Sequence, residues 1–238
     1  MKILLLSDIH GNYPALTAVA KKLPPKNFDC IINCGDSTVY APFPNQVLNW
    51  LQENKAISIL GNTDRKVIKL LKGKSFKKPS KPEKRIMYTS TTEDLNRANK
   101  KYLLQLSKKK ILHLRKRKVG IFHGSPEHAN EFLFPTTPIS RFRELAACCG
   151  CNIVITGHSH TPYHKRTASV DFINPGSTGR MFDGDPRASC AVLTLKKKCI
   201  KVRHYRISYC IDDVVRELAR QQLPPIYARM YKKGRKLN

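Results

Sequence analysis

The sequence predicts an α/β fold, because short apolar runs alternate along the chain with amphipathic stretches of helical spacing. The first apolar run covers residues 2–7, and an amphipathic stretch from Tyr13 to Leu23 follows it and stops at Pro24-Pro25. Short continuous apolar runs are typical of parallel strands that are buried on both faces of a sheet. A chain of 238 residues is long enough for one sizeable α/β domain over 1–238, although this length also allows two smaller ones.

The remaining elements follow from the same two patterns, taken in chain order. Further strands are expected at residues 30–34, 56–60, 111–114, 119–122 and 152–156, and helices at 47–54, 93–106 and 138–149. Residues 170–173, 190–195 and 200–206 are expected to form strands of a second, more antiparallel sheet. Helical turns follow Asp212, and the basic tail over 222–238 is either a short docked helix from Ile226 or disordered.

Polar residues capable of binding metal follow five of these strands. The five junctions are Asp8-Ile9-His10, Gly35-Asp36, Gly61-Asn62-Thr63-Asp64, His123-Gly124 and Gly157-His158-Ser159-His160. Ligands of open α/β sheets bind beyond the carboxyl ends of the strands, so these side chains are candidates for one site. Asp8 and His10 alone leave a second interpretation open, in which Asp8 caps the helix near Tyr13 and His10 is a loop residue.

The charge of the chain is strongly positive and unevenly distributed. Lys and Arg number 44 against 17 Asp and Glu, a formal net charge of +27, which favours phosphate-bearing partners or anionic surfaces. Most of this charge lies in an insertion-like segment over 65–118, where residues 75–85 are expected to be an exposed loop because prolines stand among the lysines. The segment is a candidate for nucleic-acid binding, and the alternative is a solvated face.

Cysteine usage and hydropathy indicate a reduced, cytoplasmic protein without a membrane segment. The eight cysteines include no Cys-x-x-Cys pair, and Met1-Lys2 does not begin a signal-peptide pattern. The cluster Cys148-Cys149-Gly150-Cys151 is interpreted as inert thiols, with soft-metal binding as the alternative. No apolar stretch approaches the roughly 20 residues that a membrane span needs.

The ordered set of five junctions resembles the calcineurin-like metallophosphoesterase superfamily. The segments Asn174-Pro175-Gly176-Ser177 and 183–189 (Asp-Gly-Asp-Pro-Arg-Ala-Ser) further resemble its bacterial and archaeal phosphodiesterase-like branch. The resemblance implies a four-layer α/β/β/α sandwich, in which two mixed sheets pack face to face between flanking helices. It also implies a dinuclear metal site, with Asp8, His10 and His160 on one ion, Asn62, His123 and His158 on the other, and Asp36 bridging both.

The implied cofactors are two divalent metal ions. Three carboxylate or amide oxygens and four imidazoles suit Mn, Fe, Co, Ni or Zn better than Ca, and Mg is a further candidate. Manganese is the first choice, from the resemblance. We also expect the helix that begins after Gly11-Asn12 to direct its positive N-terminus at a bound phosphate.

Thr63 departs from the family pattern, because many members of the superfamily carry histidine between this Asn and Asp. That histidine usually assists the leaving group, and a threonine hydroxyl is a poor general acid. The phosphodiesterase-like branch often has another residue here, so Thr63 argues mainly against an efficient phosphomonoesterase. His128 or Arg65 is a candidate substitute, with a plain surface role for His128 as the alternative. Asp64 is expected to pair with Arg65 or to support His123.

The predicted function is hydrolysis of phosphodiesters by a metal-bridging hydroxide. Its expected catalytic residues are Asp36, Asn62, Thr63, Asp64 and His123. Three alternatives stay open: a nuclease, a phosphomonoesterase or protein-phosphatase-like enzyme, and a catalytically silent metal-binding scaffold for protein partners. The oligomeric state does not follow from the sequence.

Overall fold

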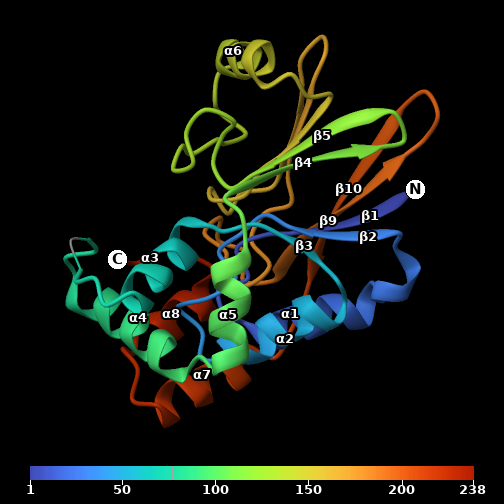
Figure 1. The fold of residues 1–238 in the computed structure, drawn as a ribbon. Coiled ribbons are helices and arrows are strands. Elements are labelled where there is room, and N and C mark those ends of the chain that lie inside the picture. The colour runs from blue at the N-terminus through green and yellow to red at the C-terminus, as the bar shows by residue number, and fades with distance from the viewer. Residues whose placement is uncertain (77) are drawn as a thin grey trace.

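Two five-stranded mixed sheets pack face to face in the computed structural model, which describes residues 1–76 and 78–238 (Figure 1). The first sheet has the strand order β10 (Ile200–Ile207), β9 (Ala188–Leu195), β1 (Lys2–Leu6), β2 (Cys30–Asn33) and β3 (Ile57–Ser58). The second has the order β4 (Lys109–Leu114), β5 (Arg117–Phe122), β6 (Ile153–Ile155), β8 (Asp171–Asn174) and β7 (Tyr163–Arg166).

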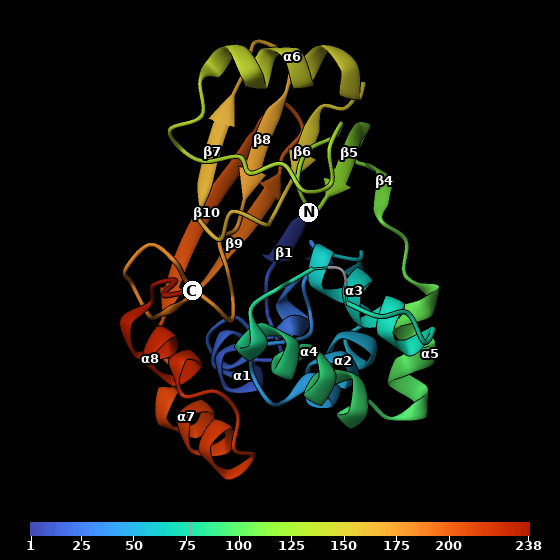
Figure 2. The ribbon, with the colours of Figure 1, turned by 90° about the vertical axis from the view of Figure 1, so that its left-hand side faces the viewer.

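Helices cover the outer faces of both sheets, which confirms the predicted α/β/β/α sandwich. Helix α6 (Ile139–Cys149) lies over the second sheet (Figure 2). On the side of the first sheet lie α1 (Tyr13–Lys22), α2 (Pro44–Glu53), α3 (Asn62–Leu71), α4 (Pro82–Asp94), α5 (Arg97–Gln105), α7 (Ile211–Arg220) and α8 (Ile226–Lys233). A 3₁₀ turn over Pro25–Asn27 connects α1 to β2.

The alternation of side chains along β1 explains why its sequence is apolar throughout. Ile3 and Leu5 belong to the core between the two sheets, whereas Leu4 and Leu6 belong to the core between the first sheet and its helices. Successive strand residues point to opposite faces, so a strand in a middle layer needs apolar residues at every position. The predicted parallel pairing is also present, since β1 pairs with β2 in parallel register.

The expected second, more antiparallel sheet was wrong in its membership. Strands β9 and β10 belong to the first sheet, where β9 pairs antiparallel with β1 and Leu4 faces Val192 in the register. Strand β8 instead pairs in parallel with β6 in the second sheet. Apolar periodicity identifies strands, but it does not specify the partner of a strand that is far away in the sequence.

The basic segment contains more helix than the sequence suggested. Helix α3 was not expected, and the loop predicted over 75–85 gives way at Pro82 to the first turn of α4; Lys77, in that loop, lies outside the described residues. Proline at the first position of a helix lacks only an N–H that would have no partner there, so Pro82 begins α4. The helix expected over 93–106 is interrupted at Asn96, whose side chain caps α5 by accepting from the Asn99 amide at 2.9 Å.

The C-terminal tail forms a docked helix, one of the two outcomes considered. Tyr227, Met230 and Tyr231 of α8 are buried in the core beneath the first sheet. Among the described residues, no helix is both long and apolar enough to cross a membrane.

Replacing Leu5 by alanine is expected to lower the free energy of unfolding by about 3 kcal/mol, because a fully buried leucine between two sheets leaves a cavity that neither sheet can fill. Urea denaturation in the presence of a chelator measures this loss. Leu104→Ala, at a leucine that is 49% exposed, is the matched control and should change stability by less than about 0.5 kcal/mol. A loss at Leu5 no larger than that of the control would contradict the layered core.

Candidate metal centre

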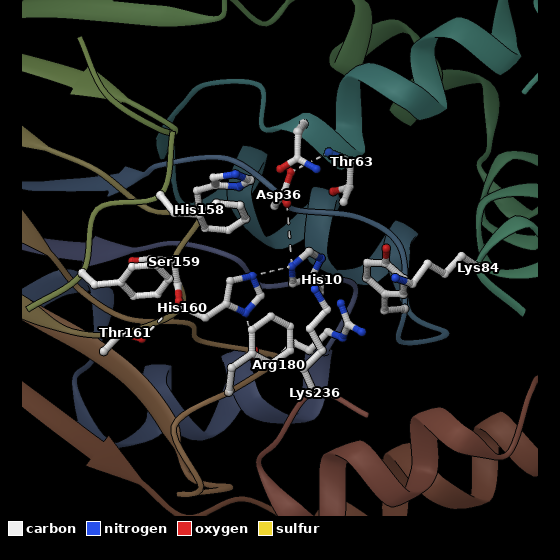
Figure 3. A pocket seen from close by; sticks show the side chains of 15 residues that line it. His10, Asp36, Thr63, Lys84, His158, Ser159, His160, Thr161, Arg180 and Lys236 are labelled. Carbon is white, nitrogen blue, oxygen red and sulfur yellow. Dashed lines mark hydrogen bonds and ion pairs between the residues drawn. The ribbon is translucent and has the colours of Figure 1, made fainter. Parts of the chain in front are cut away.

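The five predicted strand ends meet at one edge of the sandwich and bring their polar side chains together. Figure 3 shows His10, Asp36, Thr63, His158 and His160 around one cavity. Two groups of metal-ligand atoms result, and within each group the ligand atoms lie within 4.8 Å of one another. The first group comprises Asp8, His10 and His160, and the second comprises Asp36, His123 and His158. All six residues are buried.

The first group contains a carboxylate oxygen that the protein leaves without a hydrogen-bond donor. Oδ2 of Asp8 accepts from the Ser7 hydroxyl at 2.6 Å and from the His158 amide at 3.0 Å, which fixes the carboxylate. Oδ1 is buried without a hydrogen-bond partner among the described residues and lies 3.3 Å from His160 Nε2. His10 Nε2 is also 3.3 Å from that nitrogen. A buried acceptor beside two imidazole nitrogens fits a cation, which satisfies all three.

The second group is extended by Asn62, the first residue of α3. Its side-chain oxygen points at three other acceptor atoms: His123 Nε2 at 3.0 Å, His158 Nδ1 at 2.9 Å and Asp36 Oδ2 at 3.2 Å. In this orientation four lone-pair atoms converge, and a cation between them would turn their mutual repulsion into coordination. The donor set of both groups therefore fits divalent metal ions.

Asp36 stands between the two groups. Its Oδ2 lies 3.8 Å from His10 Nε2 of the first group and 3.5 Å from His123 Nε2 of the second. Its Oδ1 accepts from the Thr63 amide at 2.8 Å. Burial alone would raise the pKa of Asp36, but His123, His10 and the Thr63 amide outweigh it and hold this pKa well below the usual range.

Backbone carbonyls orient the four imidazoles so that one nitrogen of each faces the centre. The bonded nitrogen is Nδ1 in His10, His123 and His160, which contact the carbonyls of Thr38, Cys34 and Arg180, and Nε2 in His158, which contacts the carbonyl of Asn130. A ring nitrogen that donates to a carbonyl leaves a lone pair on the other nitrogen, which is the arrangement of metal-binding histidines.

The pKa values of three of these histidines favour the neutral, ligating form. Burial lowers the pKa of His10 to about 3 and that of His158 to about 4, and it lowers the pKa of His160 well below its usual range. For His123, burial acts in the same direction, but Asp36 outweighs it and raises the pKa to about 9. Protonation of His123 would therefore compete with metal binding at the second group.

Two glycines allow the loops to approach each other closely. A Cβ on Gly157 would lie 1.9 Å from Ser7 Oγ, and a Cβ on Gly61 would lie 2.0 Å from Asp36 Oδ1. The Asn174–Ser177 segment supports the same loops. The side-chain amide of Asn174 donates to the Gly157 carbonyl at 2.8 Å, and the Ser177 hydroxyl donates to the Asp8 carbonyl at 2.7 Å. The segment that carried the finer family resemblance thus fixes the loops that bear Asp8 and His158.

Asp64 does not make either of its expected contacts, with Arg65 or with His123. Its carboxylate is fully buried and accepts instead from the amides of Gly61, Ser37 and Thr38 and from the Thr38 hydroxyl at 2.7 Å. It therefore ties the start of α3 to the loop after Asp36. The sequence-based expectation failed because two of these partners, Thr38 and Ser37, lie 26 and 27 residues away in the chain.

The capping alternative for Asp8 is also wrong, since Asn12 caps α1 by accepting from the Ala15 amide at 3.0 Å. The expected phosphate site at this N-terminus is not formed, because the amides of Gly11, Asn12 and Tyr13 already donate to backbone carbonyls. The N-terminus of α3, which the sequence did not predict, faces the centre instead and donates to Asp36 through the Thr63 amide.

The centre opens into a cavity of about 400 Å³, hereafter the metal-centre cavity. Thr63 lines it, and the Thr63 hydroxyl donates to the Thr38 carbonyl at 3.4 Å. His128 is exposed in a turn outside this lining, and Arg65 donates to Asn130 Oδ1 at 2.6 Å beside the cavity. Sequence reasoning missed several lining residues: Tyr40, Lys84, Phe132, Phe134, Arg180, Phe182 and Lys236. None of them carried a local sequence signal, because they come from separate parts of the chain that only the fold brings together.

The cysteine cluster carries no metal group in the described part of the chain. Cys148 is exposed, Cys149 half-buried and Cys151 buried, and none of them belongs to either ligand group. All eight cysteines are free thiols.

A four-layer sandwich with two adjoining groups of histidine and carboxylate ligands at one edge defines a class of metal-binding α/β proteins. The model of the calcineurin-like phosphoesterase superfamily domain matches residues 1–198, and the chain belongs to this superfamily.

Relatives extend the match over nearly the whole chain. An uncharacterized protein of Methanocaldococcus jannaschii is 26% identical over 239 residues, 93% of each chain. The crystal structure of a metallophosphoesterase from Sphaerobacter thermophilus has a TM-score of 0.82 at 26% identity and covers 98% of this chain and 100% of that one. A hypothetical protein from Pyrococcus horikoshii OT3 has a TM-score of 0.88 at 18% identity and covers 99% of both chains.

Replacing Asp64 by alanine is expected to lower the free energy of unfolding by about 3 kcal/mol, because three buried amides and a hydroxyl lose their acceptor together. Chemical denaturation of the chelator-treated protein measures this loss. The control is Asp213→Ala, at an exposed carboxylate that pairs with Arg216 within its own helix. Equal stability of the two variants would show that Asp64 does not hold these loops together.

Proposed function

We propose that the protein is a divalent-metal-dependent phosphodiesterase with a dinuclear centre. Asp8, His10 and His160 would hold one ion, Asn62, His123 and His158 the other, and Asp36 both. The position of Asp36 Oδ2, within 3.8 Å of an imidazole nitrogen from each group, is the observation that carries the proposal. The superfamily of the chain supports phosphoesters as the substrate class.

The donor set supports manganese as the first choice of ion, because three oxygens and four imidazole nitrogens suit divalent metals of the first transition series. When bound, such ions lower the pKa of water and neutralise charge on phosphoryl oxygens. The protein supplies the geometry: backbone carbonyls fix the imidazoles, and the Ser7 hydroxyl and His158 amide fix Asp8.

Thr63 supports a diester over a monoester. Its side chain is 2% exposed, its amide is committed to Asp36 and its hydroxyl to the Thr38 carbonyl. A hydroxyl in this position does not titrate near neutral pH, so it supplies no proton to a leaving group. The phosphodiesterase-like branch that the chain resembles often has a residue other than histidine at this position, which is consistent with Thr63 in a diester-cleaving enzyme.

Replacing Asp36 by alanine is expected to reduce hydrolysis of bis(p-nitrophenyl) phosphate with manganese by at least about 1,000-fold, because one side chain serves both ions. Metal analysis should show about two ions per chain in the wild type and fewer than one in the variant. Asp212→Ala, at an exposed carboxylate on α7, is the control. It should keep the wild-type rate of hydrolysis and the two bound ions. Equal rates for Asp36→Ala and wild type would refute the proposal. Stoichiometric metal without turnover on any phosphoester would favour the scaffold.

A nuclease is the second candidate, favoured by a basic groove that adjoins the centre. The groove has a volume of about 740 Å³ and shares Asn62, Phe132 and His158 with the metal-centre cavity. Its cations are Arg65, Lys66, Lys69, Lys72, Lys74 and Lys108. Such a groove follows a nucleic-acid backbone through its phosphates, independent of sequence.

Replacing Lys69, Lys72 and Lys74 together by alanine is expected to weaken binding of a single-stranded 20-nucleotide probe. The slope of log binding constant against log salt concentration should become shallower by about 2. Fluorescence anisotropy over a salt series measures both. The control triple, Lys196, Lys197 and Lys198→Ala, removes the same charge from the end of β9 and the turn to β10. Equal slopes for the two triples, or no binding at low salt, would remove the nuclease interpretation.

A further inference from the structure

Three cations from separate parts of the chain lie on one wall of the metal-centre cavity. Lys84 belongs to α4, Arg180 follows β8, and Lys236 follows α8 (Figure 3). Among the described residues that line this cavity, Asp36 is the only carboxylate, and it is committed to the metal centre. Burial, together with the charges of Lys236 and Arg180, lowers the pKa of Lys84 and outweighs the neighbouring Glu83, which acts in the opposite direction.

Arg180 is buried, and it forms no ion pair with a carboxylate of the described residues. It is 6% exposed, its Cζ lies 3.8 Å from the ring centre of Tyr40 and 4.9 Å from that of Phe182, and its Nη2 contacts Met230 Sδ at 3.5 Å. Its Nε has no hydrogen-bond partner among the described residues. Aromatic faces compensate part of the charge, but a buried guanidinium with an unused donor still favours an anion.

The cations lie close enough to the metal centre for one substrate to reach both. The Tyr40 ring that contacts Arg180 is 5.2 Å from the His10 imidazole, and the Phe182 ring stacks on the His160 imidazole at 4.0 Å. The backbone of Arg180 also contacts the metal centre, since the Arg180 carbonyl contacts His160 Nδ1. The Arg180 backbone amide donates to Ser177 Oγ at 2.7 Å. One aromatic ring thus separates the guanidinium from each of two ligand histidines.

The C-terminal residues complete this wall. Asn238 donates to Glu83 Oε1 and to the Tyr227 hydroxyl, both at 3.2 Å, which ties the end of the chain to α4. The Gly184 amide donates to the Gly234 carbonyl at 2.9 Å, which ties the end of α8 to the loop after Arg180. These contacts hold Lys236 beside Arg180 and Lys84, although the three residues are far apart in the sequence.

We infer that Lys84, Arg180 and Lys236 bind a second phosphoryl group of the substrate, next to the one at the metal centre. The inference rests on the proposed function and names its substrate class: phosphoesters that carry at least two phosphoryl groups. A guanidinium presents paired donors to phosphate oxygens, and two ammonium groups add charge. The second phosphoryl group comes either from the next position of a nucleotide chain or from a phosphoanhydride.

Calorimetric binding of three thymidine nucleotides to the manganese-loaded protein tests this inference. Thymidine 5′-phosphate has one phosphoryl group, thymidine 3′,5′-bisphosphate has two that are separated by the sugar, and thymidine 5′-diphosphate has two that are adjacent. The wild type should bind at least one of the last two about 10-fold to 100-fold more tightly than the first. Tighter binding of the bisphosphate identifies a nucleotide chain as the source, and tighter binding of the diphosphate identifies an anhydride.

Two pairs of variants attribute the preference to these cations. Lys84→Met with Lys236→Met should abolish it, whereas Lys81→Met with Lys233→Met removes the same charge next to α4 and at the end of α8, outside the cavity lining, and should preserve it. Arg180→Met should reduce the preference and Arg180→Lys should restore part of it; the lysine pair keeps the test valid if the Arg180 variants do not fold.

Equal affinity of the wild type for all three nucleotides, or an unchanged preference in the Lys84 and Lys236 double variant, would overturn the inference. Turnover of bis(p-nitrophenyl) phosphate, which has a single phosphoryl group, is measured in parallel on the wild type. Turnover without a preference for two phosphoryl groups refutes the subsite alone. A preference without turnover refutes the proposed function and leaves the subsite standing.

Discussion

The Asp36 carboxylate is buried at 2% exposure where two groups of imidazole nitrogens meet, and much of the surrounding structure serves to hold it there. A buried carboxylate is stable only if donors or cations surround it. The Thr63 amide supplies one donor, and Gly61 leaves the space for Asp36 that a Cβ would fill. Asp64 in turn fixes the start of α3, so that the Thr63 amide stays directed at Asp36. The packing of both sheets brings the imidazoles to the same carboxylate.

The loops that carry the ligands adopt backbone conformations that most residues avoid. Five residues of the two groups have φ angles between +51° and +66°: Asp8, His10, Asp36, His158 and His160. Aspartate and histidine tolerate this left-handed region better than branched residues do, but it still costs free energy, and such residues gather at functional sites. The loop contacts through Asn174 and Ser177 offset that cost. The backbone conformation of these loops therefore helps to place the side chains of both candidate ligand groups.

Sequence reasoning selected the residues that the fold gathers into the two candidate ligand groups, because their information is local. Each apolar run ends on its own polar residues, so Asp8, Asp36 and His123 could be read from short segments, and the resemblance supplied their grouping. The membership of β9 in the first sheet and the contacts of Asp64 depend on partners far away in the chain, which periodicity does not specify. The cavity wall was missed for the same reason, since Lys84, Arg180 and Lys236 are unremarkable among 44 basic residues until the fold places them together.

Thr63 and the three cations of the cavity wall place the same demand on the leaving group. A committed, non-titrating hydroxyl cannot protonate a departing alkoxide, which needs a proton near neutral pH. A phosphate ester leaving from an anhydride is already stable as an anion, because its second ionisation falls near pH 6. In the proposed subsite, Lys84, Arg180 and Lys236 would stabilise such an anion by charge rather than by proton transfer. Thr63 and the cationic wall are thus consistent with one requirement, a leaving group that is stabilised by positive charge rather than by a proton.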